Sequence, residues 1–498
     1  MKILQASAEC YGLAKTGGLA DMVSSLSTTL NHMGHDNRIC LPAYRGTIEQ
    51  LTKVVRGGHF PVQGYDFELV EGVLEPSGQT IFLLNCPELY ARDGDPYRDA
   101  DDAEFSDNGL RFGCFNLAIT HLIACGFGSW QPEIVHLHDW HLGLVAALLK
   151  QQKNSVKTVF TIHNFSFHGL FDRELFNQLD LPENWWHPEA LEFYNRFSFM
   201  KAGLLYADTV TVVSPRYADE IQTAQFGCGL EGLVANQSKR IQGILNGIDQ
   251  NEWNPGKDPH LTCTYNKRSV TSGKKANKTA LQKLLGLPVK DVPLVIFIGR
   301  LAEQKGPDLI LDARSAMEKH AIQLVVLGRG EPHLESAFRN WATEMPEQVA
   351  CVIDINEQMA HLLTAAADLQ LMPSRFEPCG LSQMYAQRYG TLPVAHRTGG
   401  LADTIVDATT ENLGSAAATG FLFDRLDVDC LIQTLNKALD LLQEKNTLKK
   451  LRQAAMSQDF SWALSAGAYI DLYTKLLKNP TSRVSALTAK PALAELSH

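Results

Sequence analysis

Two basic residues stand five positions apart in segment 299–306, directly after an apolar run and before Pro307, where a helix is expected to start. Arg300 carries a planar guanidinium that can form two parallel hydrogen bonds with a phosphate, and Lys305 adds a compact point charge. On one loop, the two cations can converge on a diphosphate. A solvated loop with ordinary surface charges accounts for the same spacing, so the spacing alone leaves both interpretations open.

A carboxylate follows another apolar run. Glu377 lies in segment 374–381, after the run Leu369–Met372, and Pro378 and Gly380 delay the helix that comes next. Glu377 is therefore expected near a helix N-terminus, where it could orient sugar hydroxyls or stabilise positive charge on a sugar ring. The structural alternative is an acid that caps the helix.

Histidine and acidic residues stand at the ends of two further runs. Asp139 and His141 follow the run Ile134–His138, and His163 follows the run 158–162. An isolated histidine is more often structural than catalytic. Several of them at neighbouring strand ends indicate a polar site.

The elements that must position these residues are short, β-rich apolar runs separated by longer helical patterns. This alternation is typical of βαβ units and predicts an α/β protein with parallel sheets. The predicted strands are 2–7, 134–138, 158–162 and 209–213 in the first half, and 294–298, 323–327, 351–355 and 369–372 in the second. Parallel sheets bind ligands beyond the carboxyl ends of their strands, so two facing sheets would enclose one polar cleft.

One six-residue sequence occurs twice. Thr-Gly-Gly-Leu-Ala-Asp spans 16–21 and again 398–403, preceded by Lys15 and Arg397. Paired glycines such as those at Gly18 expose backbone N–H groups at a helix N-terminus, where the helix dipole favours an anion. The repeat predicts a phosphate-facing turn in each half, although these residues are common enough for a chance match.

Composition excludes several classes of protein. The 498 residues suit two or three domains, and a net charge of −10 argues against a broad surface for nucleic acid. The first residues lack the pattern of a signal peptide. No apolar run is long enough to span a membrane, so we expect no membrane partner. The ten cysteines have no metal-ligand or disulfide spacing, so we expect no metal and a cytosol-like compartment.

Taken together, these motifs resemble those of bacterial glycogen synthases and starch synthases, the retaining glycosyltransferases of family 5 that use ADP-glucose. Any one motif is weak, but the set follows the family order along most of the chain. The matching segments are 15–21, 138–141, 161–164, 243–249, 299–306, 374–380 and 397–401.

The resemblance implies the GT-B architecture, in which two Rossmann-like domains face a central cleft. In this architecture, residues 1–255 would form an N-terminal domain on the acceptor side, and residues 275–460 a C-terminal domain on the donor side. Residues 461–478 would form a helix that crosses back to the N-terminal domain. The polar, turn-rich passage 251–277 is the predicted boundary or hinge. The Ala-, Ser- and Lys-rich segment 479–498 is predicted to be a mobile tail.

The resemblance also implies roles for two overlapping sets of residues. The catalytic set, which contacts the transferred glucose or the leaving diphosphate, is Glu377, His163, Arg300, Lys305 and Asp139. The donor-binding set is Lys15, Gly18, Asn246, Arg300, Lys305, Ile355, Cys379, Gly380 and Leu381. The resemblance implies no metal and no cofactor apart from the donor substrate.

The sequence departs from the family pattern at a few positions. Asp354 and Ile355 stand where many members carry Gly or Lys and then an aromatic residue that packs on the nucleotide base. An aliphatic side chain covers a base with less stacking, so the preference for ADP-glucose over UDP-glucose is left open. His168 and His396 stand where Gln and Arg are frequent.

The implied reaction transfers glucose from ADP-glucose to the non-reducing end of an α-1,4-glucan, such as glycogen, starch or a maltooligosaccharide, with retention of configuration. Arg300, Lys305 and the Gly18 turn would stabilise charge on the leaving diphosphate while the acceptor O4 attacks from the same face. The implied location is the cytoplasm, or the stroma in a plant or alga, and the oligomeric state stays open.

Three rival functions are weighed against this one. A UDP-glucose-dependent transferase of the same fold is disfavoured by the long match at 15–21. A silent glucan-binding protein is disfavoured by the intact set of site residues. A nicotinamide oxidoreductase is disfavoured because the dinucleotide-binding glycine fingerprint is missing.

Overall fold

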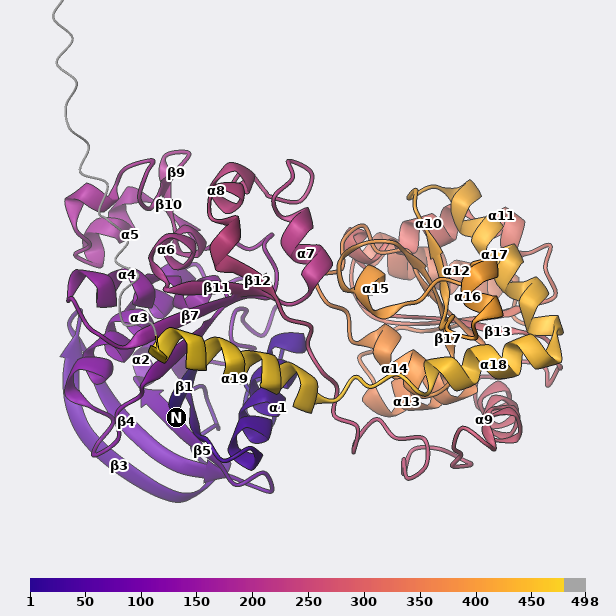
Figure 1. The fold of residues 1–498 in the computed structure, drawn as a ribbon, viewed down its shortest axis with the longest axis horizontal. Coiled ribbons are helices and arrows are strands. Elements are labelled where there is room, and N and C mark those ends of the chain that lie inside the picture. The colour runs from indigo at the N-terminus through magenta and orange to yellow at the C-terminus, as the bar shows by residue number, and fades with distance from the viewer. Residues whose placement is uncertain (479–498) are drawn as a thin grey trace, which may run out of the picture.

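The computed structural model describes residues 1–478, and Figure 1 shows two α/β units side by side with chain segments crossing between them. Each unit is built around one large sheet with helices on both faces. The predicted α/β class with two Rossmann-like units is confirmed. The predicted tail at 479–498 lies outside the described residues.

The first unit contains a nine-stranded sheet in the order β12-β11-β7-β6-β1-β2-β5-β4-β3. Its strands are β1 (Lys2–Ala6), β2 (Asp36–Pro42), β3 (Leu51–Val62), β4 (Tyr65–Leu74), β5 (Gln79–Asn85), β6 (Ile134–His138), β7 (Lys157–Ile162), β11 (Thr209–Val212) and β12 (Ile241–Gly243). Pairing is parallel from β12 to β5 and antiparallel from β5 to β3. The sequence analysis did not predict this antiparallel extension, because most of β3 is exposed and gives no apolar run.

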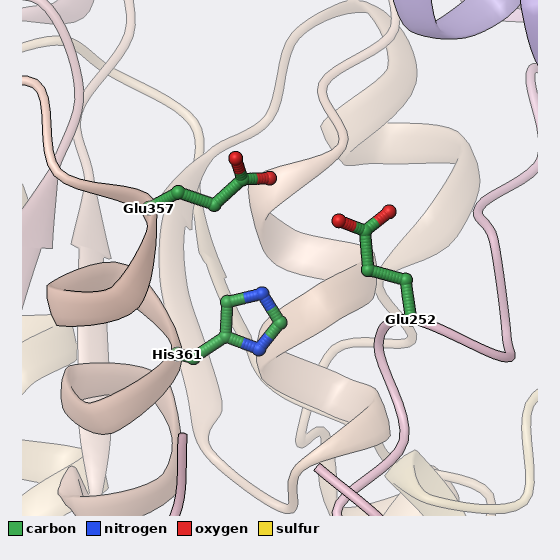
Figure 2. A group of neighbouring side chains, drawn as sticks. All are labelled: Glu252, Glu357 and His361. Carbon is green, nitrogen blue, oxygen red and sulfur yellow. The ribbon is translucent and has the colours of Figure 1, made fainter. Parts of the chain in front are cut away.

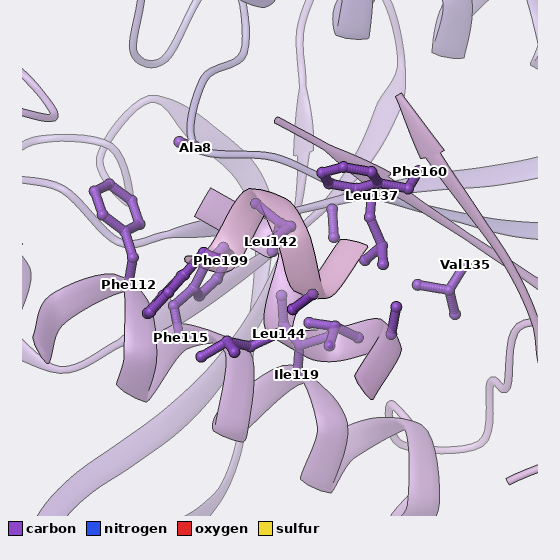
Figure 3. Packing of buried hydrophobic residues seen from close by; sticks show 14 of the residues in the cluster. Ala8, Phe112, Phe115, Ile119, Val135, Leu137, Leu142, Leu144, Phe160 and Phe199 are labelled. Atoms are coloured by element: carbon purple, nitrogen blue, oxygen red, sulfur yellow. The ribbon is translucent and has the colours of Figure 1, made fainter. Parts of the chain in front are cut away.

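The side chains of β1 show how the sheet is covered on both faces. Leu4 and Ala6 pack into one cluster with Phe115 and Leu144, whereas Ile3 packs into another with Leu26. Successive residues of a strand point to opposite faces, so a strand covered on both sides is mostly apolar, and a buried polar residue such as Gln5 needs a hydrogen-bond partner. Figure 3 shows the first cluster, where Leu137, Leu142, Phe160 and Phe199 gather against Phe112, Phe115 and Ile119.

The helices of the first unit surround this sheet. They are α1 (Gly18–His32), α2 (Pro87–Tyr90), α3 (Asn108–Cys125), α4 (Gly143–Gln151), α5 (Arg173–Gln178), α6 (Phe199–Tyr206), α7 (Pro215–Glu220) and α8 (Glu231–Asn236), with 3-10 turns at Trp140–Leu142, Glu183–Trp185 and Ser238–Arg240. A small antiparallel sheet, in the order β8 (Leu170–Phe171), β10 (Arg196–Ser198) and β9 (Glu192–Phe193), completes the unit.

The second unit contains a six-stranded, all-parallel sheet in the order β15-β14-β13-β16-β17-β18. Its strands are β13 (Leu294–Ile298), β14 (Gln323–Leu327), β15 (Val349–Val352), β16 (Leu369–Met372), β17 (Leu392–His396) and β18 (Phe421–Phe423). The predicted strand 351–355 is wrong in position, since β15 ends at Val352. Asp354 and Ile355 therefore lie in the loop after the strand.

The helices of the second unit run from α9 to α18. They are α9 (Val270–Leu284), α10 (Pro307–Asp312), α11 (Arg314–Met317), α12 (Pro332–Glu344), α13 (Glu357–Ala366), α14 (Ser382–Arg388), α15 (Gly399–Thr404), α16 (Thr410–Gly414), α17 (Val428–Gln443) and α18 (Lys445–Ala455), with a 3-10 turn at Glu303–Lys305. The last helix of the described chain, α19 (Trp462–Lys478), packs on the first unit. Within residues 1–478, every helix is too short or too polar to span a lipid bilayer.

The passage predicted as a hinge, 251–277, is turn-rich only in its first part. Helix α9 starts at Val270, and the buried Lys274 ammonium donates to the carbonyl oxygens of Ala365 and Tyr389 at 3.0 and 3.1 Å. These bonds fix α9 to the second unit. Residues 270–277 of the predicted boundary or hinge therefore belong to a helix that packs on the second unit.

Helix α19 returns from the second unit to the first and lies beside α1 (Figure 1). The crossing is anchored where the Ile248 N–H donates to the Phe460 carbonyl at 2.8 Å. Within the helix, Tyr473 is fully buried and its hydroxyl lies 2.7 Å from Nδ1 of His136 in β6. Helix α19 thus supplies a hydrogen-bond partner for a buried polar side chain of the first sheet.

We expect Tyr473→Phe to lower the free energy of unfolding of the first unit by about 1–3 kcal/mol, because Nδ1 of the buried His136 loses its hydrogen-bond partner while Nε2 keeps Thr161. Urea titration followed by circular dichroism measures the change. Tyr194→Phe removes the same hydroxyl from a residue that is 79% exposed and should have no effect. Equal effects of the two substitutions would contradict the role given to the buried bond.

Candidate active site

An open cleft of about 1980 Å³ runs between the two units, at the carboxyl ends of strands from both sheets. The structure brings every predicted site residue to this cleft. From the first unit come Lys15, Gly18, Asp139, His163 and Asn246, and from the second come Arg300, Lys305, Ile355, Glu377, Cys379, Gly380 and Leu381. The two strand-end clusters predicted from sequence therefore face one shared space.

The central contact of the second unit is an ion pair between Lys305 and Glu377. The Lys305 Nζ lies 2.8 and 2.6 Å from the two carboxylate oxygens, and the Ser374 hydroxyl donates to Oε2 at 3.1 Å. The Glu377 side chain is 6% exposed and that of Lys305 is 24% exposed. A nearly buried carboxylate with three such bonds has a fixed orientation toward the cleft.

Arg300 stands beside this pair and is exposed to solvent. Its Nη2 donates to the Gln304 amide oxygen at 3.2 Å, and the Gln304 amide in turn donates to the Phe376 carbonyl at 3.4 Å. These bonds connect the Arg300 loop to the Glu377 loop. The guanidinium keeps free donors for an anion in the cleft.

The second Thr-Gly-Gly-Leu-Ala-Asp copy does not form the predicted phosphate-facing turn. The Thr398 hydroxyl and the Gly399 N–H donate to Oε1 of Glu220, at 3.2 and 2.9 Å, so a carboxylate of the first unit already binds this helix start. Gly399 has a φ of +42°, and a Cβ there would lie 2.0 Å from the Glu377 carbonyl. The Gly400 N–H donates to the same carbonyl at 2.9 Å. This copy holds the backbone of Glu377.

The first copy does face the cleft, and it is shaped by Glu9. One carboxylate oxygen of Glu9 accepts from the N–H groups of Thr16 and Gly17, at 2.7 and 3.0 Å, and the other accepts from the Tyr97 hydroxyl at 2.7 Å. Lys15 pairs with Asp21 at 2.9 Å. Sequence reasoning missed Glu9 and Tyr97, and the only available signal was that Glu9 closely follows the end of β1.

Asp139 and His163 form the polar floor of the first unit. Asp139 has a φ of +57°, unusual for a residue with a side chain, and its Oδ1 accepts from the N–H of His163 at 2.7 Å. Burial raises the pKa of Asp139 to about 7, although two backbone N–H donors oppose the shift. Burial lowers the pKa of His163 to about 3, so its imidazole is neutral at physiological pH.

A chain of imidazoles fixes the ring of His163. Its Nε2 lies 3.1 Å from Nδ1 of His138, whose Nε2 lies 2.7 Å from the Gln5 amide oxygen in β1. His141, another predicted strand-end residue, stacks on Tyr97 with ring centroids 4.9 Å apart. The ring of His163, which faces the cleft, is thus held through His138 of β6 by Gln5 of β1.

The remaining predicted residues differ in what they offer to a ligand. Oδ1 of Asn246 is buried without a hydrogen-bond partner among residues 1–478, so it can accept from a bound ligand. Ile355 is 85% exposed, and burial raises the pKa of the Cys379 thiol to about 12, which keeps it protonated. His396 binds the Ser374 carbonyl at 2.8 Å and so supports the Glu377 loop, while Nε2 of His168 is buried without a partner among the described residues.

Comparison with known families gives two matches that follow each other along the chain. Residues 2–236 match the family described as starch synthase catalytic domain, and residues 286–458 match glycosyl transferases group 1. A glycogen synthase of Cellvibrio japonicus is 46% identical over 478 residues, covering 95% of this chain and 99% of the relative. A glycogen synthase of Thioalkalivibrio sulfidiphilus is 45% identical, covering 96% and 100%.

Two solved structures show the same arrangement. The catalytic domain of starch synthase IV from Arabidopsis thaliana, bound to ADP and acarbose, is 32% identical with a TM-score of 0.86, covering 96% of this chain and 99% of that one. Sucrose-phosphate synthase from Thermosynechococcus elongatus is 19% identical with a TM-score of 0.60, covering 96% and 99%, and shares the fold.

The raised pKa of Asp139 predicts a pH-dependent stability that Asp139→Asn removes. The pKa of the Asp139 carboxyl is raised from its ordinary value of 3.8 to about 7 in the folded state. Its ionisation therefore lowers the free energy of unfolding progressively as the pH rises from 3.8 to about 7. The asparagine keeps the Oδ1 acceptor for the His163 N–H and does not ionise. We therefore expect the variant to gain stability relative to the wild type from pH 4 to 7, and no further above pH 7.5.

Urea midpoints measured at half-unit steps of pH test this expectation. Asp440→Asn, on α17 and away from the cleft, is the matched control and should follow the wild type. A difference between Asp139→Asn and the wild type that stays constant across this range would contradict the raised pKa.

Proposed function

The chain belongs to the family of bacterial glycogen synthases and transfers glucose to an α-1,4-glucan, and we propose that its donor substrate is ADP-glucose. The observation that supports a nucleotide diphosphate sugar as donor is the Lys305–Glu377 ion pair in the cleft, with the exposed cation of Arg300 beside it. A diphosphate needs the cations, and a glucosyl group needs an oriented carboxylate. The related starch synthase IV structure contains ADP, which is the leaving group of this donor.

In the proposed complex, Arg300 and Lys305 hold the donor diphosphate, with Lys15 and the turn at Gly18 on the opposite wall. Charge on the diphosphate grows as the bond to the glucosyl C1 breaks, so these groups bind the transition state more tightly than the ground state. Their removal should therefore reduce turnover more than it weakens substrate binding.

The transferred glucose lies between the two units. Glu377 accepts from its hydroxyl groups, and neutral His163 contributes a hydrogen bond without a charge. Asp139 and Asn246 help to position the ring; the free Oδ1 of Asn246 supports this role. The acceptor O4 attacks from the face that the diphosphate leaves, which retains the α configuration.

The base of the nucleotide lies near Ile355, while Cys379, Gly380 and Leu381 complete the donor pocket at the start of α14. Proposed acceptors are glycogen and maltooligosaccharides, and the proposed location is the cytoplasm. The ten cysteines are all free, which agrees with a reducing compartment.

Glucose transfer from radiolabelled ADP-glucose and from UDP-glucose to a maltooligosaccharide tests the donor. We expect elongation that favours ADP-glucose and falls about 100-fold or more in kcat for Arg300→Ala and for Glu377→Ala. Glu411→Ala, on α16 outside the cleft, removes an exposed carboxylate and should leave kcat unchanged. Preference for UDP-glucose would refute the proposed donor, and an unchanged kcat in Arg300→Ala would refute its role.

The exposure of Ile355 gives a second, independent prediction. Replacing it by tyrosine supplies an aromatic face for the adenine, and base stacking on an aromatic side chain contributes about 1–3 kcal/mol. We expect Ile355→Tyr to lower KM for ADP-glucose at least about fivefold with little change in kcat, while Ile355→Val stays close to the wild type. Steady-state kinetics at saturating glucan measures both, and an increased KM in the tyrosine variant would place the base elsewhere.

A further inference from the structure

Three side chains at the mouth of the cleft form a cluster that the proposed reaction does not use. Glu252 lies in the linker after β12, and Glu357 and His361 lie one turn apart at the start of α13. One ligand atom from each of the three lies within 4.8 Å of the others. Figure 2 shows both carboxylates and one ring nitrogen of His361 pointing into the same gap.

The two carboxylates lack a basic partner. Among residues 1–478, neither Glu252 nor Glu357 forms a salt bridge with a lysine, arginine or histidine, and Lys15, across the cleft, pairs with Asp21 instead. Two carboxylates this close repel each other unless a cation lies between them.

His361 adds the observation that an acidic cluster alone lacks. The residue is 2% exposed, and its hydrogen bonds within residues 1–478 are made by Nδ1, which leaves Nε2 available to a ligand. Its Nδ1 lies 2.7 Å from Oδ2 of Asp258, and its ring stacks on Trp253 with centroids 3.8 Å apart. Asp258 also accepts from the Tyr389 hydroxyl at 2.6 Å, so its carboxylate is itself held in place.

This arrangement has a chemical consequence. A carboxylate that accepts from Nδ1–H leaves the lone pair of the histidine on Nε2, and such carboxylate–histidine pairs orient imidazole ligands toward metal ions. The stack on Trp253 prevents the ring from turning away. The lone pair is thus directed at the gap between the two glutamates.

We propose that Glu252, Glu357 and Nε2 of His361 bind a divalent transition-metal ion of the Zn²⁺ class at the mouth of the cleft. One imidazole and two carboxylates suit Zn²⁺ better than Mg²⁺, which prefers oxygen ligands and retains several waters. A tetrahedral ion with ligand bonds of about 2.1 Å holds its ligand atoms roughly 3.4 Å apart. The two exposed glutamate side chains can close that difference by rotation.

The bound ion has a structural effect rather than a role in glucose transfer. It ties the linker at Glu252 to the start of α13, two residues after Ile355, and it neutralises two charges that face the cleft. The sequence could not reveal this site, because its ligands come from segments far apart in the chain. The inference stands on geometry alone and does not depend on which nucleotide sugar is the donor.

Isothermal titration of the chelator-treated full-length enzyme with ZnCl₂ tests the site. We expect one ion to bind the wild type, and Glu252→Gln and Glu357→Gln each to weaken binding by at least about tenfold. Titration with MgCl₂ should show much weaker binding. Glu411→Gln is the matched control and should bind Zn²⁺ as the wild type does.

A second measurement distinguishes the site from a merely structural cluster. Thermal melts should show that Zn²⁺ raises the melting temperature of the wild type but not that of the double variant Glu252→Gln/Glu357→Gln, and that without metal the double variant melts no lower than the wild type. Equal Zn²⁺ affinity of the wild type and the double variant would put the ion elsewhere, for example on the exposed thiols, and overturn the proposal. Failure of the wild type to bind Zn²⁺ would overturn it as well.

Discussion

The candidate active site is organised around one ion pair, between Lys305 and the nearly buried carboxylate of Glu377. Glu377 is 5% exposed, and a buried carboxylate is costly unless a cation and hydrogen-bond donors surround it. Lys305 and Ser374 supply them from two neighbouring strand ends. The same ion pair keeps Lys305 where a diphosphate would bind, so one interaction prepares both the sugar and the phosphate parts of the site.

The backbone beneath Glu377 is also where the two units meet. Gly399 and Gly400 pack against the Glu377 loop, and the Gly399 N–H donates to Glu220 of the first unit. The Ser214 hydroxyl donates to the Pro378 carbonyl at 2.6 Å, next to Glu377 itself. A change in the angle between the units therefore acts on the loop of Glu377, so closure of the cleft would change the position of this carboxylate.

The sequence patterns predicted the loops that follow buried parallel strands. They did not predict the contacts that those loops make with other segments of the chain. Buried parallel strands are mostly apolar, so β6, β13 and β16 were visible despite the buried His136, His138 and Gln370, and with them the loops that carry Asp139, Arg300 and Glu377. The exposed β3 gave no such signal. The turn at 398–403 looked like a phosphate site because nothing in its local sequence shows that Glu220, from the other unit, binds its N–H groups. Glu9 lies in the same unit as the turn it binds, but no apolar run or repeated motif includes it, so it was missed for a different reason.

A double-mutant cycle on kcat tests the central claim that Lys305 and Glu377 act as one unit. The size-matched variants Lys305→Met and Glu377→Gln are compared singly and together for glucose transfer from ADP-glucose to a maltooligosaccharide. If the ion pair organises the site, the double variant should be little slower than the slower single variant, with a coupling of at least about 1.4 kcal/mol, or tenfold. Losses that simply multiply would show that the two residues act independently and would contradict this account.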